Sequence, residues 1–151
     1  MSEMRDSNPL SAVYSKFRAL YYRDVLHKVK LRELSLTTSE VYCVDIIHNL
    51  NKPTIQEFSN FIGISSPNAT YKVNSLIKKG YLKKVQSETD KREYYLDVTE
   101  KYYRYYNINQ KYLDIIENRL KETLSEEEFN IFNNTLIKIY DELIPEIPLD
   151  E

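Results

Sequence analysis

The sequence predicts a mainly helical fold that contains one small β-hairpin. Three observations support this class. Only 2 Gly and 5 Pro interrupt the 151 residues, which favours long helices and few tight loops. Apolar residues recur at steps of three and four over most of the chain, as they do on one face of a helix. From Tyr81 to Ser87 and from Arg92 to Thr99 the chain instead forms two short runs rich in Tyr, Val and Leu, which are typical of paired strands.

The chain begins with two predicted helices. The first, from Pro9 to about Leu31, carries apolar residues at helical steps: Leu10, Val13, Tyr14, Phe17, Leu20 and Tyr21. The second begins after Thr37 and runs to about Asn49. Thr37 and Glu40 lie three residues apart and fit a capping box, in which each side chain satisfies an unpaired backbone N–H of the first turn.

A third and a fourth helix follow closely. Thr54 and Glu57 repeat the capping-box pattern, and Gly63 ends this short helix as a left-handed C-cap residue does. Ser66 is expected to be the N-cap of the fourth helix, with a proline at its first position, and Gly80 to close it. Two helices joined by a short turn around a glycine form a helix-turn-helix. The apolar row of the fourth helix consists of Ala69, Val73, Leu76 and Ile77.

Two long helices are predicted after the hairpin. Thr99 is the expected N-cap of the fifth helix, and Ser125 with Glu128 forms a capping box for the sixth. Pro145 and Pro148 end the sixth helix. Its apolar residues are spaced 3, 4, 3 and 4 apart, as in a heptad seam that pairs with another helix: Phe129, Phe132, Leu136, Ile139 and Leu143.

Composition excludes a membrane protein and favours the cytoplasm. Hydrophobic residues make up 42% of the chain, and no apolar stretch approaches the ~18–20 residues that span a bilayer. The first ten residues carry charges and a proline, so we expect no signal peptide. Cys43 is the lone cysteine and cannot form an internal disulfide, which fits a reducing compartment.

Positive charge concentrates in one segment of an otherwise acidic chain. The net charge is −2, but the segment from Ser65 to Arg92 holds seven basic and two acidic side chains. The segment therefore carries +5 and the remainder −7. Such a segment is typical of a phosphate-binding surface, although solvated lysines alone would give the same count.

A hairpin that follows a helix-turn-helix makes a winged helix-turn-helix, here residues 36–99 of a single domain 1–151. The fourth helix fits a DNA major groove, where the N-terminal residues of such helices read base edges. A solvated amphipathic helix is the alternative, but the adjoining basic hairpin favours DNA. We expect base or phosphate contacts from Ser66, Asn68, Tyr71, Lys72, Ser75, Lys78, Lys83, Lys84 and Lys91.

Three motifs resemble the MarR family of bacterial transcriptional regulators. Leu36-Thr37 followed by Glu40 is similar to the family's start of the second helix. Leu76–Leu82 resembles its "L-x-x-x-G-L-[IV]" junction. Ser87–Arg92, followed by Leu96 and Val98-Thr99, resembles its wing "D-x-R" and the "L-T" after it, and this match is the most specific.

The resemblance implies a homodimer on double-stranded DNA. In the family the terminal helices, here 9–31 and 100–144, interlock, and each winged lobe reads half of a pseudo-palindromic operator. It also implies that Arg92 enters the minor groove while Asp90 orients it. A ligand-responsive repressor without enzymatic activity is the expected function. The apolar terminal helices agree with a dimer, because they are too apolar to remain single.

The chain departs from the family at two places. The family often has "T-R" where this chain has Thr70-Tyr71, and a tyrosine cannot make the bidentate contact with guanine that arginine makes. It can contact a thymine methyl group or donate to a phosphate. The family's "T-x-x-G" after the wing is Thr99–Tyr102 here, without the glycine.

The sequence leaves the effector open among three options. Cys43 is expected to be a buried, inert thiol rather than an oxidant sensor. Glu40, Cys43 and His48 lack the spacing of a metal site, so we expect neither metal nor cofactor. The third option is a small lipophilic, phenolic or acyl ligand, since the chain faintly resembles the family's fatty-acid-synthesis repressors around 36–47 and 124–128. Its pocket is expected to be lined by Tyr14, Phe17, Tyr21, Tyr42 and Tyr112.

The strongest competing function is a winged helix that contacts proteins without reading DNA sequence. An enzyme has little support, since no Gly-rich phosphate loop and no nucleophile with a His and an acid is recognisable. Salt dependence separates the two remaining functions, because binding through phosphates weakens steeply as salt rises.

Overall fold

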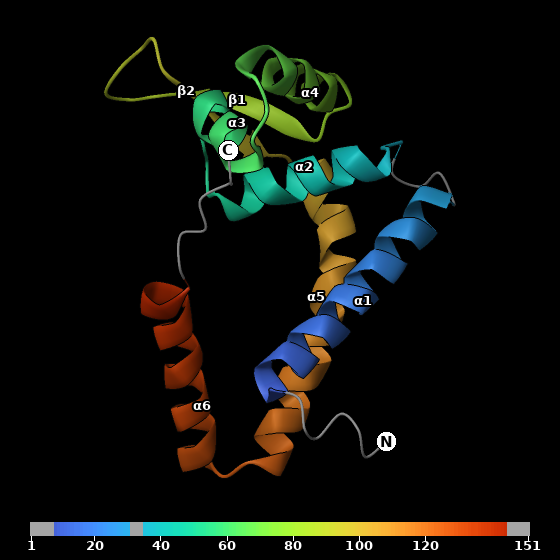
Figure 1. The fold of residues 1–151 in the computed structure, drawn as a ribbon, viewed down its shortest axis with the longest axis vertical. Coiled ribbons are helices and arrows are strands. Elements are labelled where there is room, and N and C mark those ends of the chain that lie inside the picture. Colours follow the sequence, from blue (N-terminus) through green and yellow to red (C-terminus); the bar gives the residue numbers. More distant parts are fainter. Residues whose placement is uncertain (1–7, 31–34, 145–151) are drawn as a thin grey trace. The chain divides into compact units, whose positions relative to one another are not determined.

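The computed structural model describes residues 8–30 and 35–144 (Figure 1). The chain divides into two units, residues 1–105 and 106–151. The mainly helical fold with one hairpin is confirmed. Leu31, the predicted end of the first helix, and Pro145 and Pro148, the predicted stop of the last, lie outside the described residues.

The first two helices form as predicted. Helix α1 covers Pro9–Lys30 and α2 covers Thr38–Asn49. The capping box at the start of α2 is present in both directions. The backbone N–H of Glu40 donates to the hydroxyl of Thr37 (3.2 Å), and the N–H of Thr37 donates to the carboxylate of Glu40 (2.8 Å).

Helices α3 (Ile55–Ile62) and α4 (Ser66–Lys78) form the helix-turn-helix. Gly63 ends α3 with φ of 66° and ψ of 38°, the left-handed conformation that glycine adopts without steric cost. The N-cap of α4 is Ser65, one residue earlier than predicted, and its hydroxyl accepts from the N–H of Asn68. The shift is local, because a proline is tolerated at either of the first two helical positions.

The wing is an antiparallel hairpin of β1 (Leu82–Gln86) and β2 (Tyr94–Val98), shorter at both strands than the predicted runs. Leu82 pairs with Val98 across it. The hairpin is tied to the loop between α2 and α3 at the middle of β2, where the N–H of Leu96 donates to the carbonyl of Pro53 (2.8 Å). Thr99 directly precedes α5 as predicted, but its hydroxyl donates to the carbonyl of Gly80 (2.6 Å), just after α4.

The core of the first unit lies beneath the helix-turn-helix and the wing. Side chains from α2, α3, α4 and both strands are almost wholly inaccessible to solvent there: Ile47, Phe58, Ala69, Val73, Leu76, Leu82 and Leu96. The inward row predicted for α4 is therefore correct for its three main members. Because close-packed interiors resist displacement, this core fixes which face of α4 points outward.

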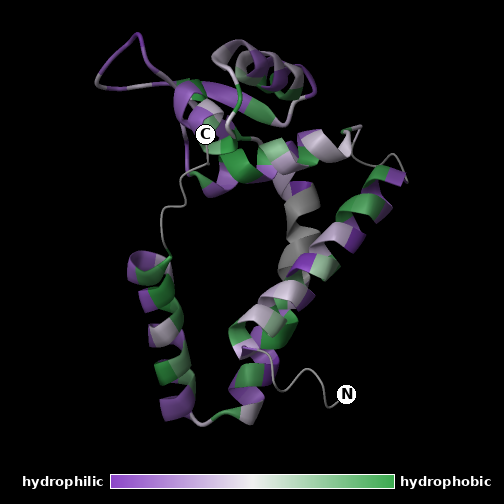
Figure 2. Ribbon diagram, in the orientation of Figure 1, coloured by the Kyte–Doolittle hydropathy of each residue, from purple (hydrophilic) through white to green (hydrophobic). Residues whose placement is uncertain are grey.

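The second unit contains most of α5 and all of α6. Helix α5 covers Glu100–Thr123, α6 covers Glu126–Lys138, and a π-helical turn covers Ile139–Leu143. The capping box of Ser125 with Glu128 is confirmed. Hydrophobic and hydrophilic residues alternate along α6 (Figure 2), and none of its side chains is buried in the single chain.

Among residues 8–30 and 35–144, no helix combines the length and the apolar character that crossing a membrane requires.

Candidate nucleic-acid interface

The outward face of α4 carries polar and aromatic side chains. Tyr71 is 78% exposed, although it is a large aromatic residue. Asn68, Asn74 and Lys78 are exposed as well. The buried row of α4 holds this face toward solvent, so these four side chains are placed to meet a partner.

Ser66, a predicted contact, is instead engaged with α3. Its hydroxyl donates to Oε1 of Gln56 (3.0 Å), and Nε2 of Gln56 donates to Oδ1 of Asn60 (2.8 Å). This chain of hydrogen bonds ties the exposed side of α3 to the first turn of α4. Ser66 is exposed and helps to join the two helices, and its contact with DNA stays a prediction.

Ser75, a predicted DNA contact, is half-buried and engages α2. Its hydroxyl donates to Oε1 of Glu40 (2.8 Å), and Nζ of Lys79 lies 2.7 Å from Oε2 of the same carboxylate. The side chains of Glu40 and Lys79 are 15% and 33% exposed. Helical periodicity placed Ser75 at the edge of the face, but it could not show that a carboxylate from α2 reaches it.

The ionised form of Glu40 is strongly favoured. Burial by itself raises the pKa of this carboxyl, but hydrogen bonds from Lys79, the backbone of Thr37 and Ser75, together with the charge of Lys79, lower the pKa to about 2. The pair therefore stays charged and pins the last turn of α4 to α2. Lys72 is also drawn toward α2, where its Nζ lies 3.4 Å from the hydroxyl of Ser39.

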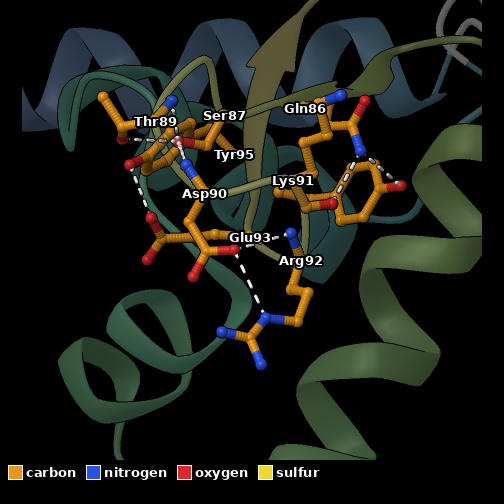
Figure 3. A network of polar contacts seen from close by, with 9 residues as sticks. Gln86, Ser87, Thr89, Asp90, Lys91, Arg92, Glu93 and Tyr95 are labelled. Atoms are coloured by element: carbon orange, nitrogen blue, oxygen red, sulfur yellow. Dashed lines mark hydrogen bonds and ion pairs between the residues drawn. The ribbon is translucent and has the colours of Figure 1, made fainter.

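The tip of the wing is ordered by the buried hydroxyl of Ser87, which accepts from the backbone N–H groups of Thr89 (3.3 Å) and Asp90 (3.2 Å) (Figure 3). Oδ1 of Asp90 in turn accepts from the backbone N–H of Arg92 (2.9 Å) and lies 3.5 Å from its Nε. The side chain of Arg92 is 93% exposed and extends away from the loop. A fixed loop thus presents an accessible guanidinium group.

Two more contacts fix the sides of the wing. Nε2 of Gln86 donates to the carbonyl of Lys91 (2.6 Å), and the hydroxyl of Tyr95 donates to Glu93 (2.8 Å). The hydrogen bond to Glu93 raises the pKa of Tyr95. Sequence reasoning did not find these residues, because their partners are set by the conformation of the loop rather than by any helical or strand period.

The lysines of β1 differ in their surroundings. Lys83 and Lys84 are both exposed, as predicted. Nζ of Lys83 lies 3.7 Å from a carboxylate oxygen of Asp97 on β2, and Nζ of Lys52 lies 3.8 Å from the same oxygen. Asp97 therefore screens part of the positive charge on this side of the hairpin, which the summed charge of the segment did not reveal.

The residues predicted to line an effector pocket are only partly brought together. The rings of Tyr21 and Tyr42 lie 6.1 Å apart, and Tyr22, which was not predicted, packs against both at 6.0 and 6.3 Å. Phe17 is half-buried, whereas Tyr14 is 60% exposed. Tyr112 belongs to the second unit. Within the first unit, Tyr21, Tyr22 and Tyr42 thus form a tyrosine cluster between α1 and α2, and the five-residue pocket stays a prediction.

A polar junction beside this cluster joins three helices. Asp45 of α2 accepts hydrogen bonds from the hydroxyl of Tyr21 on α1 and from the hydroxyl of Tyr102 on α5 (2.8 Å for Tyr102). Burial is the main cause that raises the pKa of Asp45, and these two hydroxyls oppose it. The sequence offered one signal for this junction, namely that position 102 holds a tyrosine where the MarR family has a glycine.

A cavity of about 110 Å³ is lined by residues of α2 and the turn after it, of β2 and of the first turn of α5. It contains none of the predicted effector residues. Its lining consists of Ile47, His48, Asn51, Lys52, Leu96, Asp97, Val98 and Tyr103.

Cys43 is buried, as predicted, and is 6% exposed. Burial raises the pKa of its thiol, which disfavours the reactive thiolate. Among the residues that the structure describes, no group of three His, Cys, Asp or Glu side chains is arranged to hold a metal ion.

The winged lobe is similar to known proteins. Residues 36–94 match the model of the MarR family. A mutant of MepR from a multidrug-resistant S. aureus clinical isolate is similar in fold (TM-score 0.64, 16% identity, covering 91% of this chain and 99% of that one). Streptococcus pneumoniae FabT, crystallised in complex with DNA, is similar at a TM-score of 0.51 and 22% identity, over 89% and 96% of the two chains.

A further similar structure is a putative MarR-family regulator from Listeria monocytogenes complexed with 26mer DNA. It has a TM-score of 0.50 and 22% identity, over 91% of this chain and 89% of that one. No curated protein sequence matches the chain. At these identities the solved structures show the fold, and the family model matches most of the winged lobe.

Proposed function

We infer, from the match of residues 36–94 to the MarR family model, that the chain is a MarR-type DNA-binding transcription regulator. We propose further that it acts as a homodimer on a pseudo-palindromic operator and represses transcription until a ligand binds. The observation that carries this function is that one lobe exposes two elements, the polar outward face of α4 and the guanidinium of Arg92. The helix that bears the first and the wing loop that bears the second are each fixed by internal hydrogen bonds.

Each exposed element suits one groove of duplex DNA. An α-helix fits the major groove, and its first turns carry Asn68 and Tyr71. Arg92, 93% exposed at the tip of the wing, suits the narrow minor groove, whose negative potential attracts arginine. Lys78, Lys84 and Lys91 are exposed nearby in sequence and suit phosphates. Two related structures contain DNA, which supports the proposal by similarity of fold.

Exposed apolar side chains on the terminal helices support a homodimer. Leu10 and Val13 of α1 are 62% and 53% exposed. Along the predicted seam of the last helix, Phe132, Leu136 and Leu143 are 37%, 45% and 58% exposed. Contiguous exposed apolar surface on a single chain marks an interaction site, and a closed two-fold pair is the commonest assembly. Sedimentation at micromolar concentration should give about twice the chain mass.

The tyrosine cluster of Tyr21, Tyr22 and Tyr42 supports a ligand of lipophilic, phenolic or acyl character. Aromatic rings present apolar faces together with polar hydroxyl groups, which suits such molecules. The cluster lies between α1, a proposed dimerisation helix, and α2, which packs against α4. A ligand bound at this cluster would change the distance between α1 and α2, and through α2 the position of α4.

Selection of bound sequences from a random duplex pool tests the function. The purified full chain should enrich a pseudo-palindromic site. Its affinity for that site should fall steeply as salt rises: in a plot of log affinity against log salt concentration, the slope should be roughly −0.9 for each phosphate contacted. A scrambled duplex provides the matched control. A protein that retains no duplex at low salt is instead a winged helix for protein contacts, the competing function.

A further inference from the structure

Most polar side chains at α4 fall into two sets. One set contacts neighbouring helices: the exposed Ser66 contacts Gln56, Lys72 lies near Ser39, and Ser75 and the C-cap residue Lys79 contact Glu40. The other set consists of the exposed side chains of Asn68, Tyr71, Asn74 and Lys78. The first two exposed residues stand in the first two turns, where base edges are read, while Lys78 stands at the end of the helix.

In the first two turns of α4, the exposed set lacks the chemistry that reads guanine, since its lysine, Lys78, stands at the end of the helix. Guanine is recognised by a cation that donates to its O6 and N7 atoms, most often arginine. Between Leu36 and Thr99 the chain has one arginine, Arg92, and it lies on the wing. Lys72, the lysine closest to the start of α4, is half-buried and drawn toward α2. Its place near Ser39 leaves the first turns of α4 without an outward cation.

The same set has the chemistry that reads adenine and thymine. The carboxamide of asparagine pairs with N6 and N7 of adenine, donating one hydrogen bond and accepting another. The ring of Tyr71, 78% exposed, presents an apolar face and edge of the kind that contacts the methyl group of thymine. Asn68 stands in the first turn, which is fixed by the Ser65 cap, whose hydroxyl accepts from the backbone N–H of Asn68, and Tyr71 stands in the next turn.

We propose that α4 recognises A·T base pairs in the major groove, with Asn68 on adenine and Tyr71 against a thymine methyl group. The inference rests on the proposed function, since it names the target of the same DNA-binding surface. Arg92 supports it independently, because a single exposed arginine on the wing suits the narrow minor groove of A·T-rich DNA. Both grooves then select the same base composition.

The first test is the base composition of the selected half-sites. The positions that α4 covers should be occupied by A·T pairs. Half-sites with G·C pairs at those positions would overturn the inference and leave the proposed function intact. Duplexes retained without any sequence preference would overturn the proposed function itself, so the two failures are distinguishable.

Atom-level substitutions in the selected duplex test each residue. Replacing the contacted adenine with 7-deazaadenine removes the N7 acceptor and should weaken the parent protein about tenfold. Asn68→Ala should be equally weak on both duplexes. Replacing the contacted thymine with uracil removes one methyl group and should cost the parent about fourfold, the effect of one buried carbon group. Tyr71→Ala should not distinguish the two bases, whereas Tyr71→Phe, the matched control, should retain the difference.

Lys84→Ala provides a control for general loss of affinity. It should weaken binding to the natural and the modified duplexes in equal proportion, because a phosphate contact carries no base information. A parent protein that binds natural, 7-deazaadenine and uracil duplexes equally well would overturn the assignments of Asn68 and Tyr71.

Discussion

Two pairs of a carboxylate and a cation flank the proposed reading surface, and they differ in depth. Glu40 and Lys79 meet at 2.7 Å behind α4 and are 15% and 33% exposed, whereas Asp90 and Arg92 approach to 3.5 Å on the wing and are 51% and 93% exposed. The inner pair joins two helices. The outer pair orients a side chain that remains accessible. We therefore expect the inner pair to act on stability and the outer pair on DNA binding.

The comparison also shows why the charge of a segment is not the charge available to a partner. The segment from Ser65 to Arg92 holds seven basic side chains. Lys79 is bound to Glu40, and Lys83 lies beside Asp97. Partners from outside the segment thus neutralise part of the surface that the sequence count predicted.

The largest expected effect is on the inner pair. Glu40→Ala should lower the free energy of unfolding by about 2–3 kcal/mol, because it removes the capping box of α2 and leaves Lys79 and Ser75 without their acceptor. Urea unfolding of the purified protein at pH 7 measures this loss. Glu40→Gln, which retains a capping side chain but no charge, should lose about half as much. A loss below about 0.5 kcal/mol for Glu40→Ala would contradict the stabilising role.

Breaking the outer pair should weaken DNA binding and leave the free energy of unfolding almost unchanged. Arg92→Ala should weaken DNA binding about 10- to 100-fold, because the planar guanidinium makes several contacts in a confined groove. Its free energy of unfolding should change by less than about 0.5 kcal/mol, as for exposed ion pairs. Fluorescence anisotropy on the selected operator measures the affinity. Lys91→Ala, a neighbouring exposed cation, should lose less, and equal losses for the two variants would contradict the role of Arg92.

Local signals in the sequence predicted the elements well. The three capping boxes, at Thr37, Thr54 and Ser125, each depend on residues three positions apart and form as expected. The left-handed Gly63 is equally local. The predicted N-cap of α4, Ser66, differs by one residue from the observed one, Ser65, because two serines precede the proline and both suit an N-cap position.

Contacts between elements could not be predicted in the same way. Ser75 was expected to face DNA, since no helical wheel shows that Glu40, more than thirty residues earlier, reaches both it and Lys79. The junction of Asp45 with Tyr21 and Tyr102 was missed for the same reason. The residues of the DNA surface remain a prediction, which substitutions at these positions test.

A third prediction uses pH to separate the inner carboxylates. The pKa of Glu40 falls from 4.5 to about 2 on folding, so its stabilisation is present above pH 4.5 and is lost as the pH falls toward 2. The pKa of Asp45 is raised instead, so its protonation adds stability as the pH falls from neutrality toward its ordinary value of 3.8.

Unfolding free energies of the parent and of Glu40→Gln, measured between pH 2.5 and pH 7, check this sign. The stability of the parent should fall by about 1–2 kcal/mol more than that of the variant below pH 4.5, an amount reduced by the partial solvation of the pair. Asp45→Asn should abolish the gain on the way down from neutral pH. Parallel curves for the parent and Glu40→Gln would show that the carboxylate is not held ionised by Lys79.

The smallest expected effect belongs to Asp90. Asp90→Ala removes the acceptor for both the backbone N–H and the Nε of Arg92, so the guanidinium must be ordered on binding at the cost of its rotamer freedom. The same change removes a negative charge near the DNA phosphates, which favours binding. We expect orientation to outweigh repulsion, so Asp90→Ala should weaken binding about two- to fivefold. Asp90→Asn, which keeps an oxygen acceptor without the charge, should bind at least as well as the parent. Tighter binding by Asp90→Ala on the selected operator would show that the carboxylate acts through repulsion and does not position Arg92.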